Sequence, residues 1–142
     1  MALSNDDKQH WMQNVPLFRG CSPAALARLA ERLGEIQFRA GQHMVTQGQV
    51  GNGLYVLVSG RAQVRRGDEV VTILEPMAVF GELAVLDQQP RDATVIALEP
   101  VTALALASWD LIAELEEDPQ LAINLLRELA GRIRLLEDRH VN

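Results

Sequence analysis

Short strand-like runs separated by turn signals fill the middle of the chain and constrain its fold more than any other feature. A glycine or a proline lies in every gap between these runs. Many short strands at close spacing are typical of a β-sandwich or a closed barrel. The seven runs cover residues 35–39, 43–46, 54–58, 62–66, 70–74, 93–98 and 102–107, with a hairpin turn at 66–69.

The run 54–58 indicates how the sheet is covered. Leu54, Val56 and Val58 alternate with Tyr55 and Leu57, so both sides of this run are apolar. A strand with one face in water would alternate apolar and polar residues instead. We therefore expect helices to pack against the outside of a β barrel.

Helical signals flank the strand region at both ends. Ser22 precedes a proline, which is a common helix start because serine caps free N–H groups and proline fits the first turn. Asp118 precedes Pro119 in the same way. The predicted helices cover residues 5–14, 23–33, 109–117 with Ser108 as the cap, and 119–140. The fold class is therefore mainly β with flanking α helices: an N-terminal helical segment (1–34), a β-roll (35–107) and C-terminal helices (108–142), all in one domain.

Length and charge limit the function classes. A chain of 142 residues suits one domain with its own core. The net charge of −6 argues against the basic stripe that nucleic-acid binding requires. No apolar run approaches the roughly 20 residues of a membrane span, and the start of the chain lacks the features of a signal peptide. We expect a cytoplasmic protein without direct contact to nucleic acid or membrane.

Residues that support catalysis or metal binding are scattered. His10, His43 and His140 fall in different predicted elements, which argues against a metal site. Cys21 is the only cysteine, so it forms neither an internal disulfide nor an iron–sulfur cluster with other cysteines. No serine has a histidine and an acid placed to activate it. We expect no enzyme, no metal and no cofactor.

The longest gap between predicted strands, residues 75–92, points to a function. Gly81 gives the backbone room for close approach, and Glu82 with the apolar residues after it predicts one short turn of helix. Exposed amides at such a start attract negative groups. Arg91 offers a planar fork of donors that suits a phosphate. The gap therefore predicts a binding site for one small anion.

Two motifs in residues 80–95 resemble the phosphate-binding cassette of cyclic nucleotide-binding domains, the family found in catabolite-activator-type regulators, kinase regulatory subunits and gated channels. The motifs are Phe80-Gly81-Glu82-Leu83-Ala84 and Pro90-Arg91-Asp92-Ala93-Thr94. The likeness covers most of the chain, from about residue 15, and the glycines that fall where the family's early hairpins turn are Gly41, Gly48, Gly51 and Gly60. It implies a double-stranded β-helix, which is a jelly-roll-like β-roll.

The resemblance also assigns roles. It implies that Glu82 accepts from the ribose 2′-hydroxyl, that Arg91 pairs with the cyclic phosphate, and that the amides of Leu83 and Ala84 donate to that phosphate. The ligand is then a cyclic nucleotide. The expected ligand-binding residues are Gly81, Glu82, Leu83, Ala84, Arg91, Asp92 and Ala93.

Asp92 departs from the family's pattern, which usually has a small or hydroxyl residue after the cassette arginine. A carboxylate near a phosphate is repulsive, and residues 80–95 hold three carboxylates against Arg91 alone. Asp92 also removes a threonine hydroxyl found in many guanine-selective members, which favours cAMP over cGMP. Two alternatives stay open: binding has been lost and the fold serves as an interaction or dimerisation module, or the chain is a small β-barrel enzyme.

The last predicted helix carries an apolar seam with heptad spacing over about two heptads. Its members are Ala122, Leu126, Leu129, Ile133 and Leu136. This seam either packs on the barrel or joins two copies in a two-fold dimer. In the resembled family this helix lies over the purine, within reach of Arg132, Arg134 or Glu137, and relays binding to a second subunit or an effector protein. The chain is then a stand-alone sensor or the sensing piece of a larger protein.

Overall fold

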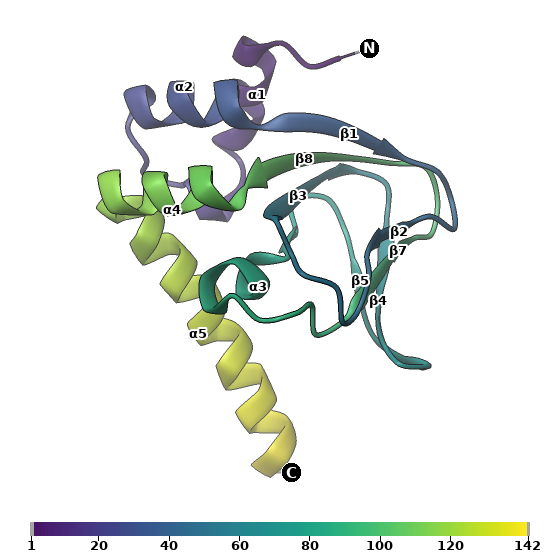
Figure 1. Ribbon diagram of the computed structural model, residues 1–142. Coiled ribbons are helices and arrows are strands. Elements are labelled where there is room, and N and C mark those ends of the chain that lie inside the picture. The colour runs from purple at the N-terminus through teal and green to yellow at the C-terminus, as the bar shows by residue number, and fades with distance from the viewer. Residues whose placement is uncertain (1, 142) are drawn as a thin grey trace.

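The computed structural model describes residues 2–141, except the side chains of Leu83, Leu136 and residues 139–141. Two four-stranded antiparallel sheets form a roll, and helices cover one side of it (Figure 1). The strand orders are β1-β8-β3-β6 and β2-β7-β4-β5. The strands are β1 (Gly34–Phe38), β2 (His43–Val45), β3 (Gly53–Ser59), β4 (Ala62–Arg66), β5 (Glu69–Leu74), β6 (Val79–Phe80), β7 (Thr94–Ala97) and β8 (Val101–Ala107). The predicted jelly-roll-like fold is confirmed.

One strand was absent from the prediction. Strand β6 lies inside the gap predicted between strands, where it pairs with Tyr55 and Val56 of β3. Two residues are too few to show an alternation of apolar and polar side chains, so the sequence carried no signal for it. Ala93, predicted to open the following strand, lies one residue before β7.

Strand β3 has a hydrophobic core on each side, as the prediction required. Leu54 and Val56 face the helices, in a cluster that includes Leu29 and Leu111. Leu57 faces the inside of the roll, in a second cluster that includes Phe80 and Ala103. The sheet β1-β8-β3-β6 therefore separates the two clusters.

The helices are α1 (Asn5–Met12), the 3₁₀ turn η1 (Pro16–Phe18), α2 (Pro23–Arg32), α3 (Glu82–Asp87), α4 (Ser108–Glu117) and α5 (Pro119–Val141). Ser22 caps α2 by accepting from the Ala25 N–H at 3.1 Å, as predicted. Asp118 caps α5 by accepting from the Gln120 N–H at 3.1 Å. No helix within residues 2–141 combines the length and apolarity needed to cross a membrane.

The predicted cap at Ser108 is wrong. Helix α4 begins at Ser108 itself, and Ala107 in the cap position has no side-chain hydrogen bond to offer. The Ser108 N–H instead donates to the Asn52 carbonyl at 2.7 Å. Strand β8 runs directly into α4, and a backbone carbonyl from a neighbouring loop satisfies one of the free N–H donors in the first turn of the helix.

Helix α5 contacts both the N-terminal segment and the roll. The buried amide of Asn124 donates to the carbonyls of Leu17 at 2.9 Å and Arg19 at 2.6 Å, which fixes η1 to α5. Figure 1 shows α5 running past α3 and extending beyond it. Arg132 of α5 donates to Glu82 and to the Val79 carbonyl, so the helix that bears the predicted seam lies beside the cassette.

The predicted seam on α5 is divided between packed and exposed side chains. Leu129 packs against the helix-side core, whereas Leu126 is 65% exposed and Ile133 is 55% exposed. An exposed apolar stripe instead combines these two residues with Ile123 and Ala130. At 3.6 residues per turn the heptad positions stay within one stripe of the helix, so the boundary between the packed side and the exposed side of α5 runs along the seam. The side chain of Leu136 lies outside the described residues.

Candidate functional site

The backbone around Arg91 is fixed by the loop that connects β2 and β3. The N–H of Gly48 donates to the Arg91 carbonyl, and the N–H of Arg91 donates to the Gln49 carbonyl, both at 2.8 Å. Val50 and Pro90 form an isolated β-bridge in the same place. The arginine therefore stands on a platform that two chain segments hold together.

The Arg91 side chain is turned into the protein and is only 8% exposed. Its guanidinium donates to the carbonyls of Gly81 at 2.8 Å and Gly53 at 2.9 Å. Burial lowers the pKa of Arg91, while Tyr55, Glu82 and Asp92 raise it. A guanidinium remains charged under such a shift, so the site holds a buried positive group.

Two glycines make room for this guanidinium. A Cβ built on Gly51 or on Gly81 would lie 2.5 Å from Arg91 atoms, closer than real contacts allow. Gly81 also has φ +87°, which a side chain would disfavour. Gly51 was expected at a hairpin turn, but it is not among the glycines with positive φ. Its role is to leave space beside Arg91.

Glu82 is the first residue of α3 and is only 2% exposed. One of its oxygens, Oε1, accepts from Arg132 of α5, and Arg132 also donates to the Val79 carbonyl at 2.8 Å. The other oxygen, Oε2, is buried and has no hydrogen-bond partner within the described part of the chain. A buried carboxylate is costly unless it is paired, so Arg132 keeps Glu82 in place and leaves one acceptor free.

The pairing of Arg132 with Glu82 was missed at the sequence level. Arg132 was one of three α5 residues expected to reach a purine, but no spacing links it to a residue 50 positions earlier. Glu128, one turn before Arg132 on α5, is a second acid in this region. Burial and the nearby Glu82 raise its pKa, whereas Arg132 lowers it. Two carboxyl groups therefore lie near one guanidinium at the contact between cassette and helix.

Asp92 is turned away from the buried part of the cassette. Its carboxylate is 3.2 Å from a guanidinium nitrogen of Arg66, which precedes the β4–β5 hairpin turn, and both side chains are more than half exposed. Such a surface pair contributes little to the stability of the fold. It does orient the Asp92 carboxylate towards Arg66. The repulsion expected from the sequence is therefore reduced by both distance from the interior and a neighbouring cation.

The remaining predicted site residues lie around the same point. Ala84 and Ala93 are buried, at 8% and 9% exposure, and Ala84 lies against the position that a Cβ on Gly51 would take. The backbone of Leu83 lies in the first turn of α3, and its side chain is outside the described residues. The structure thus brings Gly81, Glu82, Ala84 and Arg91 together and leaves Asp92 at the surface.

Other candidate chemistry finds no site in the described residues. Among the described side chains, no group of three histidine, cysteine, aspartate or glutamate residues is placed to hold a metal. Cys21 is buried, and burial together with Asp118 raises the pKa of its thiol to about 12. Such a thiol forms almost no thiolate at neutral pH, so it is unreactive.

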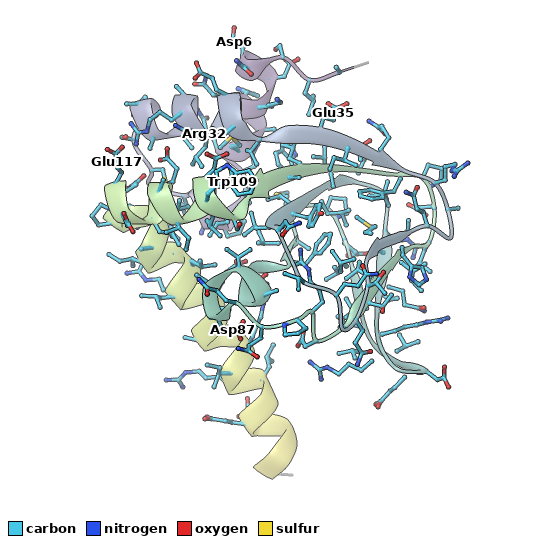
Figure 2. All side chains as sticks on the ribbon, in the orientation of Figure 1. Asp6, Arg32, Glu35, Asp87, Trp109 and Glu117 are labelled. Carbon is cyan, nitrogen blue, oxygen red and sulfur yellow. The ribbon has the colours of Figure 1, made fainter. Side chains whose placement is uncertain are left out.

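A shallow cleft of about 450 Å³ lies between α3 and α4, beside the cassette. Its lining residues are Val50, Gly51, Ala84, Val85, Gln88, Ser108, Trp109 and Ile112. Figure 2 labels Trp109 on α4, which lines the cleft, and Asp87 at the end of α3. The cleft meets the predicted anion site only at Ala84, because neither Glu82 nor Arg91 lines it.

Known proteins share the sequence features of this chain. The profile of the cyclic nucleotide-binding domain family matches residues 35–118. The cyclic AMP receptor protein of Thermus thermophilus is 34% identical over an alignment of 132 residues, and the match covers 87% of this chain and 59% of that protein. A CRP-like cAMP-activated global transcriptional regulator of Mycobacterium tuberculosis is 30% identical over 123 residues, covering 83% of this chain and 55% of the regulator.

The solved structures agree on the fold. The crystal structure of the Thermus thermophilus catabolite activator protein superposes with a TM-score of 0.79 at 29% identity, covering 87% of this chain and 61% of that one. The family profile spans more than half of the chain and includes the whole cassette. The chain therefore belongs to the cyclic nucleotide-binding domain family, and it spans somewhat more than half the length of the two regulators.

Proposed function

We propose that this chain is a regulatory domain that binds a cyclic nucleotide, with cAMP preferred to cGMP, and relays binding through α5. The observation that carries the proposal is the buried pair of opposite charges in the cassette. One carboxylate oxygen of Glu82 has no hydrogen-bond partner among the described residues, and Arg91 presents a buried guanidinium close to it. A cyclic nucleotide offers a ribose hydroxyl to the first and an anionic phosphate to the second.

Arg91 can bind a phosphate without losing its present partners. A guanidinium carries five N–H donors. Two of them are used for the carbonyls of Gly53 and Gly81, which leaves three for ligand oxygens among the described contacts. The amides of Leu83 and Ala84 at the start of α3 would add donors to the same phosphate. The protein supplies these donors in fixed positions, which reduces the ordering cost of binding.

The position of Arg132 supports relay through α5. Because Arg132 contacts the same carboxylate that would accept from the ribose, a ligand at Glu82 changes the interaction between cassette and helix. At its other end α5 holds η1 through Asn124. A ligand that favours one arrangement of these contacts shifts the population of α5 positions, and α5 passes that shift to a partner.

Calorimetric titration with cAMP and cGMP tests the proposal, with 5′-AMP as a control that lacks the cyclic phosphate. We expect heat with both cyclic nucleotides, a lower Kd for cAMP, and weaker binding of 5′-AMP. The pairing of Asp92 with Arg66 supports this expectation over the alternative of a module that has lost binding. Absence of heat with either cyclic nucleotide at high micromolar concentration would favour that alternative.

We expect the domain to act in the cytoplasm, as the sequence predicts.

The partner we propose is a second copy of this chain, bound through the exposed apolar stripe of α5. Leu126→Glu places a charge in the centre of that stripe and is expected to weaken dimerisation at least about tenfold, because burial of an unpaired carboxylate is costly. Analytical ultracentrifugation measures the change. Val70→Glu makes the same kind of substitution at an exposed site on β5, where it should leave association unchanged. A monomeric wild-type protein at high micromolar concentration would contradict the dimer.

A further inference from the structure

The aromatic ring of Tyr55 lies beside the Arg91 guanidinium. The central carbon of the guanidinium, Cζ, is 5.9 Å from the centroid of the ring. A cation within about 6 Å of an aromatic face is attracted by the electron density of the ring, and the attraction grows when water is excluded. Arg91 is buried, so the condition for a stronger interaction is met.

Tyr55 is itself held in place. Its ring stacks on Phe80, with centroids 5.3 Å apart and an angle of 14° between the planes. The two residues are direct partners in the antiparallel pairing of β3 with β6. Stacked rings on paired strands have little freedom to rotate, so the Tyr55 ring presents a fixed surface to Arg91.

Protein groups therefore surround the Arg91 guanidinium on several sides. The backbones of Gly51 and Gly81 approach it closely, and the carbonyls of Gly53 and Gly81 accept two of its donors. Carbonyl hydrogen bonds fix two nitrogens, but an arginine side chain has several rotatable bonds, and a flat surface beside the guanidinium restricts its tilt. Tyr55 provides that surface.

We infer that Tyr55 is a positioning residue for ligand recognition: its ring sets the orientation of the Arg91 guanidinium so that the remaining N–H donors face the cyclic phosphate. The inference rests on the proposed function and assigns Tyr55 no direct contact with the ligand. Its effect is therefore transmitted entirely through Arg91. If Tyr55 only stabilised the fold, its effect on ligand affinity would not depend on Arg91.

A double-mutant cycle measured by titration with cAMP tests this property. Tyr55→Leu removes the ring and is expected to raise the Kd by about three- to thirty-fold, the range for a cation–ring interaction at a partly to fully desolvated site. In an Arg91→Ala background the same substitution should change the Kd less than about twofold. Tyr55→Phe keeps the ring and should restore most of the affinity. Trp109→Leu, at a 70% exposed aromatic outside the cassette, is the matched control.

Nuclear magnetic resonance of the wild-type protein gives a second readout that does not depend on whether Tyr55→Leu folds. The ring should displace the Arg91 Hδ and Hε resonances from their ordinary positions and show cross-relaxation with them. Ordinary shifts without cross-relaxation would overturn the inference. So would equal losses from Tyr55→Leu in the two backgrounds. If wild type gives no heat with cAMP, the proposed function fails; if wild type binds and only Arg91→Ala weakens binding, the Tyr55 inference alone fails.

Discussion

Arg91→Ala is expected to raise the Kd for cAMP by about ten- to 150-fold, which corresponds to the 1.5 to 3 kcal/mol typical of hydrogen bonds to charged groups. The guanidinium is the buried cation of the cassette, and its fork matches the two exposed oxygens of a cyclic phosphate. Calorimetric titration measures the Kd, and circular dichroism checks that the fold is retained. An unchanged Kd in a folded variant would remove Arg91 from the site.

Two comparison variants separate this effect from a general loss of positive charge. Arg61→Ala removes the same charge from an exposed arginine that pairs with Glu99, and it should leave the Kd unchanged. Asp92→Ala removes the carboxylate that the sequence placed near the phosphate. Because that carboxylate is exposed and directed to Arg66, its removal should leave binding equal or slightly tighter. A large loss for Asp92→Ala would mean that the carboxylate contacts the ligand.

Arg132→Ala is expected to lower the free energy of unfolding by about 1 to 3 kcal/mol. Loss of one partner from a buried ion pair typically costs 3 to 5 kcal/mol, because the other charge remains buried without compensation. Glu82 is buried, but the Arg132 side chain is 42% exposed, so water partly replaces it and the cost is smaller. Urea unfolding followed by circular dichroism gives the value.

Arg134→Ala is the matched control for this prediction. Arg134 lies on the same helix, two residues further along and exposed, and its removal should change stability by no more than about 0.5 kcal/mol. Arg132→Lys keeps the charge but replaces two donating nitrogens with one, so it should recover only part of the loss. Equal stabilities for Arg132→Ala and Arg134→Ala would show that the Glu82 pair does not stabilise the fold.

The sequence predicted the parts of this protein that local patterns determine. Short strand-like runs between turn signals located the long strands, and Ser22 and Asp118 located two helix starts because capping depends on residues a few positions apart. The pairing of Glu82 with a helix 50 residues later depends on how α5 packs, which no local pattern encodes. Strand β6 was not predicted because its two residues are too few to form a local pattern.

The candidate site also has features that local sequence patterns predict and features that depend on tertiary packing. The motifs around Glu82 and Arg91 were visible in the sequence, and the structure brings both residues to one place. The orientation of each charge was not visible. Asp92 pairs with Arg66 because the β4–β5 hairpin lies beside the cassette, and Gly51 serves Arg91 because a loop from another part of the chain pairs with it. These relations arise only from tertiary packing.

The central claim is that a cyclic phosphate binds between the start of α3 and Arg91. The most direct test is to follow backbone and arginine side-chain resonances in ¹⁵N-labelled protein during titration with cAMP. We predict that the largest shifts occur at the amides of residues 81–84 and at the Arg91 side chain, with smaller shifts along α5. Shifts confined to the cleft between α3 and α4, around Trp109 and Ile112, or no shifts at saturating cAMP, would contradict the claim.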